Sequence, residues 1–147
     1  MCNFMEHLVV SLLCLAGHLF ITYCFYICHK NLIVEIGFKN RNPKIKHNTT
    51  NKIMRLFREL TLIDLYKKAK VNRHAVKQYF FCNCILLVSD VIAIILWASM
   101  VITNSPIDQI IRWQAGFIIA VVLGLGGVEF FMDARYSPSE RKRRGIE

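Results

Sequence analysis

Charged side chains are nearly missing from three long stretches of this sequence, although the 147-residue chain carries 19 Lys and Arg and 10 Asp and Glu. The stretches run from about 7 to 28, from 79 to 103 and from 113 to 132, and only Asp90 and Glu129 interrupt them. Each is long enough to cross a hydrocarbon layer of about 30 Å as a helix. Barrel strands would instead alternate in polarity over about 10 residues. The scarcity of charge therefore predicts an all-α integral membrane protein with three transmembrane helices.

The chain also lacks the marks of a cleaved signal peptide and of a disulfide framework. Residues 1–6 contain no Lys or Arg, and no small-x-small cleavage pattern follows the first apolar stretch. We therefore expect that stretch to be retained as a span. Five of the six cysteines lie within or beside the first two stretches, where thiols face lipid or a reducing compartment. We interpret them as small hydrophobic side chains rather than disulfide partners.

Catalytic motifs are missing as well. The sequence contains no nucleophile–base constellation, glycine-rich phosphate loop or paired metal-ligand motif. Near the expected cytoplasmic side, His74, Cys82 and Cys84 are the candidates for chemistry, but the residues around them do not match membrane cysteine peptidases. We therefore predict no enzyme activity, no cofactor and no metal site.

The charge that is present is distributed unevenly. Thirteen of the 19 Lys and Arg residues lie between Lys30 and Lys77, five follow the third stretch, and Arg112 alone lies between the second and third. Basic segments tend to stay on the cytoplasmic side of a membrane. The alternation predicts a cell (inner) membrane protein with its N-terminus outside and its C-terminus in the cytoplasm. Anionic headgroups would attract the basic segment, so its charge does not require a nucleic-acid partner.

The predicted organisation has six segments: a first span 1–29, a basic cytoplasmic loop 30–78, a second span 79–103, a short external loop 104–112, a third span 113–132 and a basic cytoplasmic tail 133–147. Within the loop, residues 30–50 are expected to be an irregular connector. From about Asn51 the apolar residues follow helical spacing, at Ile53, Leu56, Phe57 and Leu60. We expect an amphipathic helix on the cytoplasmic membrane surface. The expected membrane-surface basic residues are Lys52, Arg55, Arg58, Lys67 and Lys68.

Residues 61–80 carry a second pattern, made of Thr61, Asp64, Leu65, Ala69, Val71, Tyr79 and Phe80. In these residues the segment resembles the helix-turn-helix of TetR-type transcription regulators. The resemblance implies that Thr61 caps a first helix, with Asp64 completing a capping box, and that a second helix from about Asn72 reads a DNA groove. It covers 20 of the 147 residues, and the second helix would run directly into the second span. Membrane-tethered DNA binding through 61–80 is therefore a further hypothesis.

Two ionisable side chains lie near the middle of the predicted spans, His18 in the first and Asp90 in the second. Because these spans run antiparallel, we expect the two groups to meet near the midplane. Asn83 precedes Asp90 by seven residues and shares its helix face. His7, His18 and His29 also share a face, because eleven residues are about three helical turns. The polar residues either hold the helices together by hydrogen bonds or form a proton or ion path.

Small residues repeat along the third stretch at Gly116, Ala120, Gly124 and Gly127. This spacing lets helix backbones approach closely, so we expect a packing face toward another span of the chain or toward a second copy. Near the end of the stretch, Glu129 and Asp133 lie one turn apart beside Arg135, and we expect an ion-pair cluster there.

Together these patterns favour a small multi-pass membrane protein that acts through helix–helix contacts. The expected role is that of an accessory or inhibitory subunit, or of an immunity or exclusion factor such as plasmids and phages encode. Its expected partners are a bilayer with anionic headgroups and another membrane protein or a second copy. The alternative is a small oligomeric proton or ion channel or transporter that uses Asp90 and His18.

Overall fold

The computed structural model describes residues 2–38, 43–46, 50–136 and 142. Every regular element in these ranges is a helix, so the described part of the chain is all-α as predicted. The elements are α1 (Cys2–Phe38), α2 (Lys52–Leu60), α3 (Ile63–Lys68), α4 (Arg73–Ile102) and α5 (Ile107–Tyr136).

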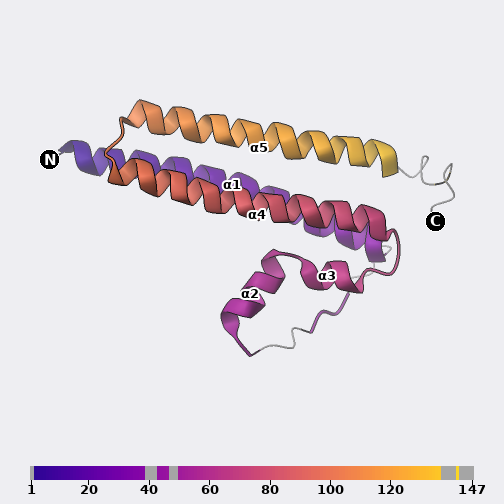
Figure 1. The fold of residues 1–147 in the computed structure, drawn as a ribbon. Coiled ribbons are helices and arrows are strands. Elements are labelled where there is room, and N and C mark those ends of the chain that lie inside the picture. Colours follow the sequence, from indigo (N-terminus) through magenta and orange to yellow (C-terminus); the bar gives the residue numbers. More distant parts are fainter. Residues whose placement is uncertain (1, 39–42, 47–49, 137–141, 143–147) are drawn as a thin grey trace.

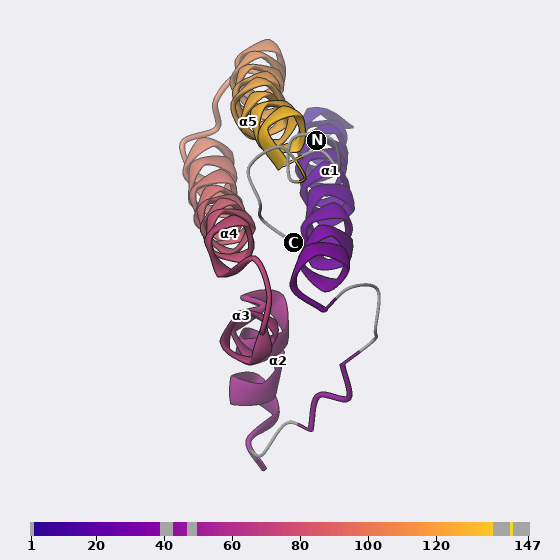
Figure 2. The same cartoon turned by 90° about the vertical axis from the view of Figure 1, so that its right-hand side faces the viewer.

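Three of these helices, α1, α4 and α5, are long and apolar enough to cross a membrane. They lie side by side as an up-down-up bundle (Figure 1). Seen along the bundle, α5 lies on one side of the α1–α4 pair and the short helices α2 and α3 lie on the other side (Figure 2). The chain thus forms three layers, with α1 and α4 in the middle.

All three long helices extend beyond the predicted spans. Helix α1 continues to Phe38 through residues that we expected to be irregular, and α4 begins at Arg73. The expected external loop 104–112 is shorter, because α5 begins at Ile107. The reason is visible in α1, where Ile33 and Ile36 are buried against α3 and α4 beyond Lys30. A charged residue marks where a helix can leave lipid, and it does not end the helix.

The amphipathic helix predicted from Asn51 is present as α2, and it ends at Leu60, the last residue of the stated apolar pattern. The Asn51 side chain accepts hydrogen bonds from the backbone N–H groups of Ile53 and Met54 and so caps the start of α2. Leu62, at φ 57°, has a left-handed backbone and breaks the helix before α3. The expected capping role of Thr61 is wrong, because its hydroxyl donates to the Phe57 carbonyl of α2 at 2.8 Å.

The apolar core lies at the end of the bundle where α1, α3 and α4 meet. It includes Ile33 of α1, Leu65 of α3, and Val76 and Tyr79 of α4, all buried. Gly37 allows the close approach here, because an added Cβ would lie 2.9 Å from Val76 Cγ2. Hydrophobic burial therefore joins the α2–α3 unit to one end of the bundle.

Candidate functional site

One face of α1 is buried and mostly polar from its first turns to Lys30. Its buried polar residues are alternately four and seven residues apart, an eleven-residue repeat that corresponds to about 3.7 residues per turn. The hydroxyls of Ser11 and Thr22 donate to carbonyls of their own helix at 3.0 Å. The three imidazoles have no such local partner and face the other helices. The buried polar residues of this face, each at most 8% exposed, are His7, Ser11, His18, Thr22 and His29.

The central imidazole contacts both other long helices. His18 Nε2 lies 3.4 Å from Asp90 Oδ1 of α4, so the structure brings together the two groups that we expected to meet. The His18 ring also stacks on Phe117 of α5, with the ring centroids 5.3 Å apart. His18 is fully buried, while the Asp90 side chain is 21% exposed. The pair is an ion pair when His18 is protonated and a long polar contact when it is neutral.

The other two imidazoles bind different parts of the chain. His7 Nε2 lies 2.5 Å from the Ser105 carbonyl in the turn between α4 and α5, so this nitrogen donates. His29 pairs with Glu129 of α5. Successive histidines are about 16 Å apart along α1, which prevents them from sharing a ligand. The three histidines therefore attach α1 to the rest of the bundle at three depths.

Asn83 does not join the His18–Asp90 pair, and that expectation is corrected. Its side-chain N–H donates instead to the Leu60 carbonyl at 2.7 Å, which ties α4 to the end of α2. Seven residues place Asn83 on the same face as Asp90 but about 10 Å farther along the helix. Two residues on the same face of a helix can therefore belong to different contacts.

Two polar contacts between the long helices were missed in the sequence. Glu129, expected to cluster with Asp133 and Arg135, turns toward His29, and the side chain of Asp133 lies outside the described residues. The eleven-residue histidine spacing is the signal that could have placed His29 opposite an acid of another span. Gln114 of α5 is also buried, and its amide lies 3.5 Å from the Ala93 carbonyl of α4.

The predicted small-residue face of α5 is open. Helix α5 buries a neighbouring side, with Ile110, Gln114 and Leu125, while Gly116, Ala120, Gly124 and Gly127 are all exposed. A Cβ added at any of these three glycines would meet no heavy atom within 4 Å. The expectation that this face seats another span of the same chain is therefore wrong.

Two grooves between α4 and α5 border the small-residue face. One, of about 860 Å³, is lined by residues that include Trp113, Gly116 and Ala120. The other, of about 410 Å³, is lined by residues that include Ala120, Gly124 and Val128. The two grooves share Phe117 and Ala120 of α5 in their linings.

Four of the predicted membrane-surface cations, Lys52, Arg55, Lys67 and Lys68, are exposed on α2 and α3. Arg58 is instead partly buried and binds Asp64 of α3 at 2.6 Å. In the segment that resembles a helix-turn-helix, residues from 73 onward are the first turns of α4, and they bury Ala75, Val76 and Tyr79 in the core.

Among the residues that the structure describes, no three His, Cys, Asp or Glu side chains gather closely enough to hold a metal ion. The structure therefore offers two features on which function can be argued: the polar face of α1 and the open face of α5. Compared with known proteins, the chain matches no family model, and neither a curated protein nor a solved structure is significantly similar to it.

Proposed function

We propose that this chain is a three-span membrane protein that binds another membrane helix through the open face of α5. It would act without catalysis, as an accessory, inhibitory, immunity or exclusion factor. Two separate arguments support the proposal, one on where the protein resides and one on how it binds.

The distribution of polarity supports residence in a membrane. Over the length of the bundle, large apolar side chains such as Leu13, Phe20 and Leu123 are exposed, while His18 and Gln114 are buried. Proteins in water show the reverse arrangement. In lipid there is no hydrophobic force between helices, and polar contacts and close packing hold them together. The bundle has the surface that a lipid solvent favours.

The charge distribution supports one orientation. The connection between α1 and α4 contains most of the cations, whereas the turn between α4 and α5 contains none and Arg112 follows it within α5. By the positive-inside rule, the α1–α4 connection and the tail after α5 lie in the cytoplasm. The N-terminus of α1 then lies outside.

The observation that carries the binding function is the exposure of Gly116, Ala120, Gly124 and Gly127 on one face of α5. Small side chains at this spacing let a second helix approach to backbone contact, where dispersion and weak hydrogen bonds accumulate. No span of this chain uses the face within the described residues. Its occupant is therefore a helix of a second copy or of another membrane protein.

A pair of glycine substitutions tests this proposal. Gly124→Leu fills the face, whereas Gly126→Leu makes the same change nearly half a turn around the helix from Gly124, where an added Cβ also meets nothing within 4 Å. We expect Gly124→Leu to weaken association about tenfold or more, a loss above ~1.4 kcal/mol. Gly126→Leu should behave like the parent chain.

Association is measured first between two differently labelled copies by energy transfer in lipid vesicles at increasing dilution. If no self-association is found, the measurement is the amount of a membrane protein that co-purifies with each variant from the native membrane. Equal association of both variants with the parent in both measurements would contradict the proposal.

A second candidate function, proton conduction, is favoured by one observation. The His18–Asp90 contact places a titratable base beside an acid near the middle of the bundle, and His29–Glu129 repeats the arrangement toward one end. Reconstituted protein should then carry a proton flux that Asp90→Asn abolishes and that Asp108→Asn, a change at an exposed acid, leaves intact. Flux no greater than in protein-free liposomes would exclude this function.

A further inference from the structure

Helix α2 exposes its apolar side chains instead of packing them against the protein. None of its nine residues is buried. Ile53, Met54, Leu56 and Phe57 are 79%, 51%, 56% and 59% exposed. An isolated helix this short is unstable in water, and an amphipathic helix normally gains stability by packing its apolar face on the protein. The apolar side chains of α2 instead remain largely exposed.

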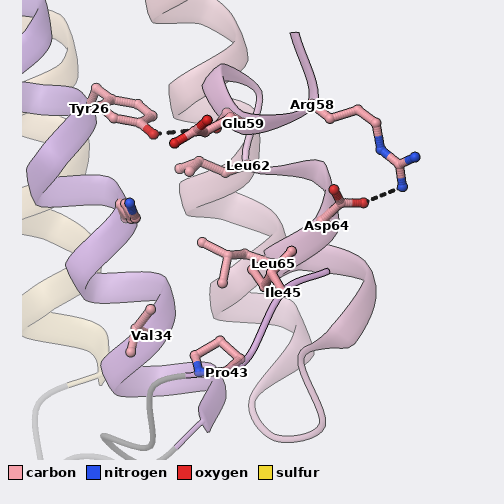
Figure 3. Close-up of a pocket in the computed structure, with 10 residues that line it drawn as sticks. Tyr26, Val34, Pro43, Ile45, Arg58, Glu59, Leu62, Asp64 and Leu65 are labelled. Carbon is pink, nitrogen blue, oxygen red and sulfur yellow. Dashed lines mark hydrogen bonds and ion pairs between the residues drawn. The ribbon is translucent and has the colours of Figure 1, made fainter. Parts of the chain in front are cut away.

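At the C-terminal end of α2 the polar side contacts the protein, while Lys52 and Arg55 on the same side are exposed. Arg58 binds Asp64 of α3, and the Glu59 carbonyl accepts a hydrogen bond from the Tyr26 hydroxyl of α1 at 3.4 Å. A cavity of about 300 Å³ lies between α1 and the α2–α3 unit (Figure 3). From α2 it is lined by Arg58 and Glu59 and by none of the apolar residues of that helix. The apolar face is therefore directed away from the bundle.

Helical spacing separates the two faces cleanly. At 100° per residue, Ile53, Leu56, Phe57 and Leu60 fall on one side of α2. Lys52, Arg55, Arg58 and Glu59 occupy the other side. A helix with this division lies stably at a boundary between an apolar and a polar medium.

The C-terminal end of α2 contacts the bundle near such a boundary in the proposed orientation. The helix runs crosswise to the three long helices, and its C-terminal end meets the bundle at Tyr26 and Asn83 (Figure 1). Tyr26 precedes Lys30 by one turn, and Asn83 follows Lys77 by less than two turns. These lysines mark the cytoplasmic ends of the spans in the proposed orientation. A helix crosswise to the spans at that level is parallel to the membrane plane.

We propose that α2 lies in the cytoplasmic lipid interface, with Ile53, Leu56 and Phe57 among the acyl chains. The apolar face of α2 contacts a bilayer that contains anionic lipid, because residues 52–70 contain six Lys and Arg against two acidic residues. Lys52 and Arg55 extend past the apolar layer to the headgroups, as long basic side chains do. The assignment rests on the proposed membrane insertion for its location, and its test separates the two.

Tryptophan fluorescence in the full-length chain tests the docking. In a chain with Trp97→Phe and Trp113→Phe, a single tryptophan is placed at Phe57→Trp on the apolar face or, as the matched control, at Glu59→Trp on the polar face. Both chains are reconstituted in vesicles with brominated acyl chains. We expect blue-shifted emission at position 57 and quenching at least about two-fold stronger than at 59, since the faces differ in depth by up to the ~10 Å helix diameter.

Changes in lipid composition and protein dilution distinguish docking on a bilayer from contact with a second copy of the chain. Quenching at position 57 should be stronger in vesicles with anionic lipid than in purely zwitterionic vesicles, and salt should reduce the difference. Blue-shifted emission that bromine does not quench, and that is lost on dilution, would show that a second copy covers α2 and would overturn the proposal.

The parent chain separates failure of this inference from failure of membrane insertion. If its native Trp97 and Trp113 are quenched while position 57 matches position 59, the bundle inserts and α2 does not dock. If the native tryptophans also escape quenching, membrane insertion itself is refuted, and with it the proposed function.

Discussion

Gly37 lies where α1 closely approaches its neighbours. A Cβ there would lie 2.9 Å from Val76 Cγ2 and 3.1 Å from Ala69 Cβ, while a Cβ at Gly17 in the same helix would meet nothing within 4 Å. Both glycines are helical, so the intrinsic preference for alanine is the same at both positions. The difference between the two positions is therefore one of packing.

Gly37→Ala should lower the free energy of unfolding by about 1–3 kcal/mol, because α1 must move away from α3 and α4. Gly17→Ala should be neutral or stabilising by up to about 1 kcal/mol. Loss of helical circular dichroism on heating in detergent micelles measures both. Equal midpoints for the two variants would show that the close approach at Gly37 contributes nothing.

At the scale of elements, the turns are held by backbone conformations that few residues adopt. Between α4 and α5, Asn104 has φ 53°, and the Thr103 hydroxyl donates to the Ser99 carbonyl at 2.9 Å. The same turn presents the Ser105 carbonyl to His7 of α1. The geometry of one short turn thus positions two helices and a contact with the third.

Replacement of Asn104 tests this role. Asn104→Gly should preserve or slightly raise stability, because glycine adopts a left-handed backbone without strain. Asn104→Val should cost about 1–3 kcal/mol, because a β-branched residue is strained there. Thermal unfolding in micelles is the measurement, and indistinguishable Gly and Val variants would rule out a conformational requirement at this position.

The long helices and the start of α2 were predictable, because apolar length and helical spacing are properties of the sequence itself. The break at Leu62 was not predictable, since a left-handed leucine has no local mark and is held by burial of its side chain in the core. The partner of Glu129 depends on how α5 rotates against α1, and that rotation is a property of the packed bundle. For the same reason, the outward direction of Gly116 and Gly124 appears only in three dimensions.

At the scale of the whole molecule, two kinds of interior occur in one short chain. The end containing α3 has an apolar core around Val76 and Tyr79, as a protein in water requires. Along the bundle, the interior instead contains His18, Asp90 and Gln114. The apolar cluster extends past Lys77 to Leu86 of α4 and Leu125 of α5, so the two kinds of interior overlap within the proposed spans.

Reporter fusions test the proposed orientation of the whole chain. An enzyme that is active only outside the cytoplasm should be inactive when fused after Glu147 and active when inserted at Asn104, because cations flank the first position and are scarce at the second. A reporter that requires the cytoplasm should give the opposite pattern at both positions. Activity of the first reporter after Glu147 would reverse the assigned topology.

The three histidines of α1 have a consequence for how the protein is made. A ribosome completes α1 before any of its partners exists, so in the proposed membrane location a nascent first helix presents three imidazoles to lipid, where unpartnered polar groups are unfavourable. Translation of α4 supplies Asp90 to His18, and the following turn supplies the Ser105 carbonyl to His7. Glu129 comes with the last helix to emerge. Because Glu129 is synthesised last, His29 is without its partner for the longest part of synthesis. A chain released before Glu129 would lack this contact between α1 and α5.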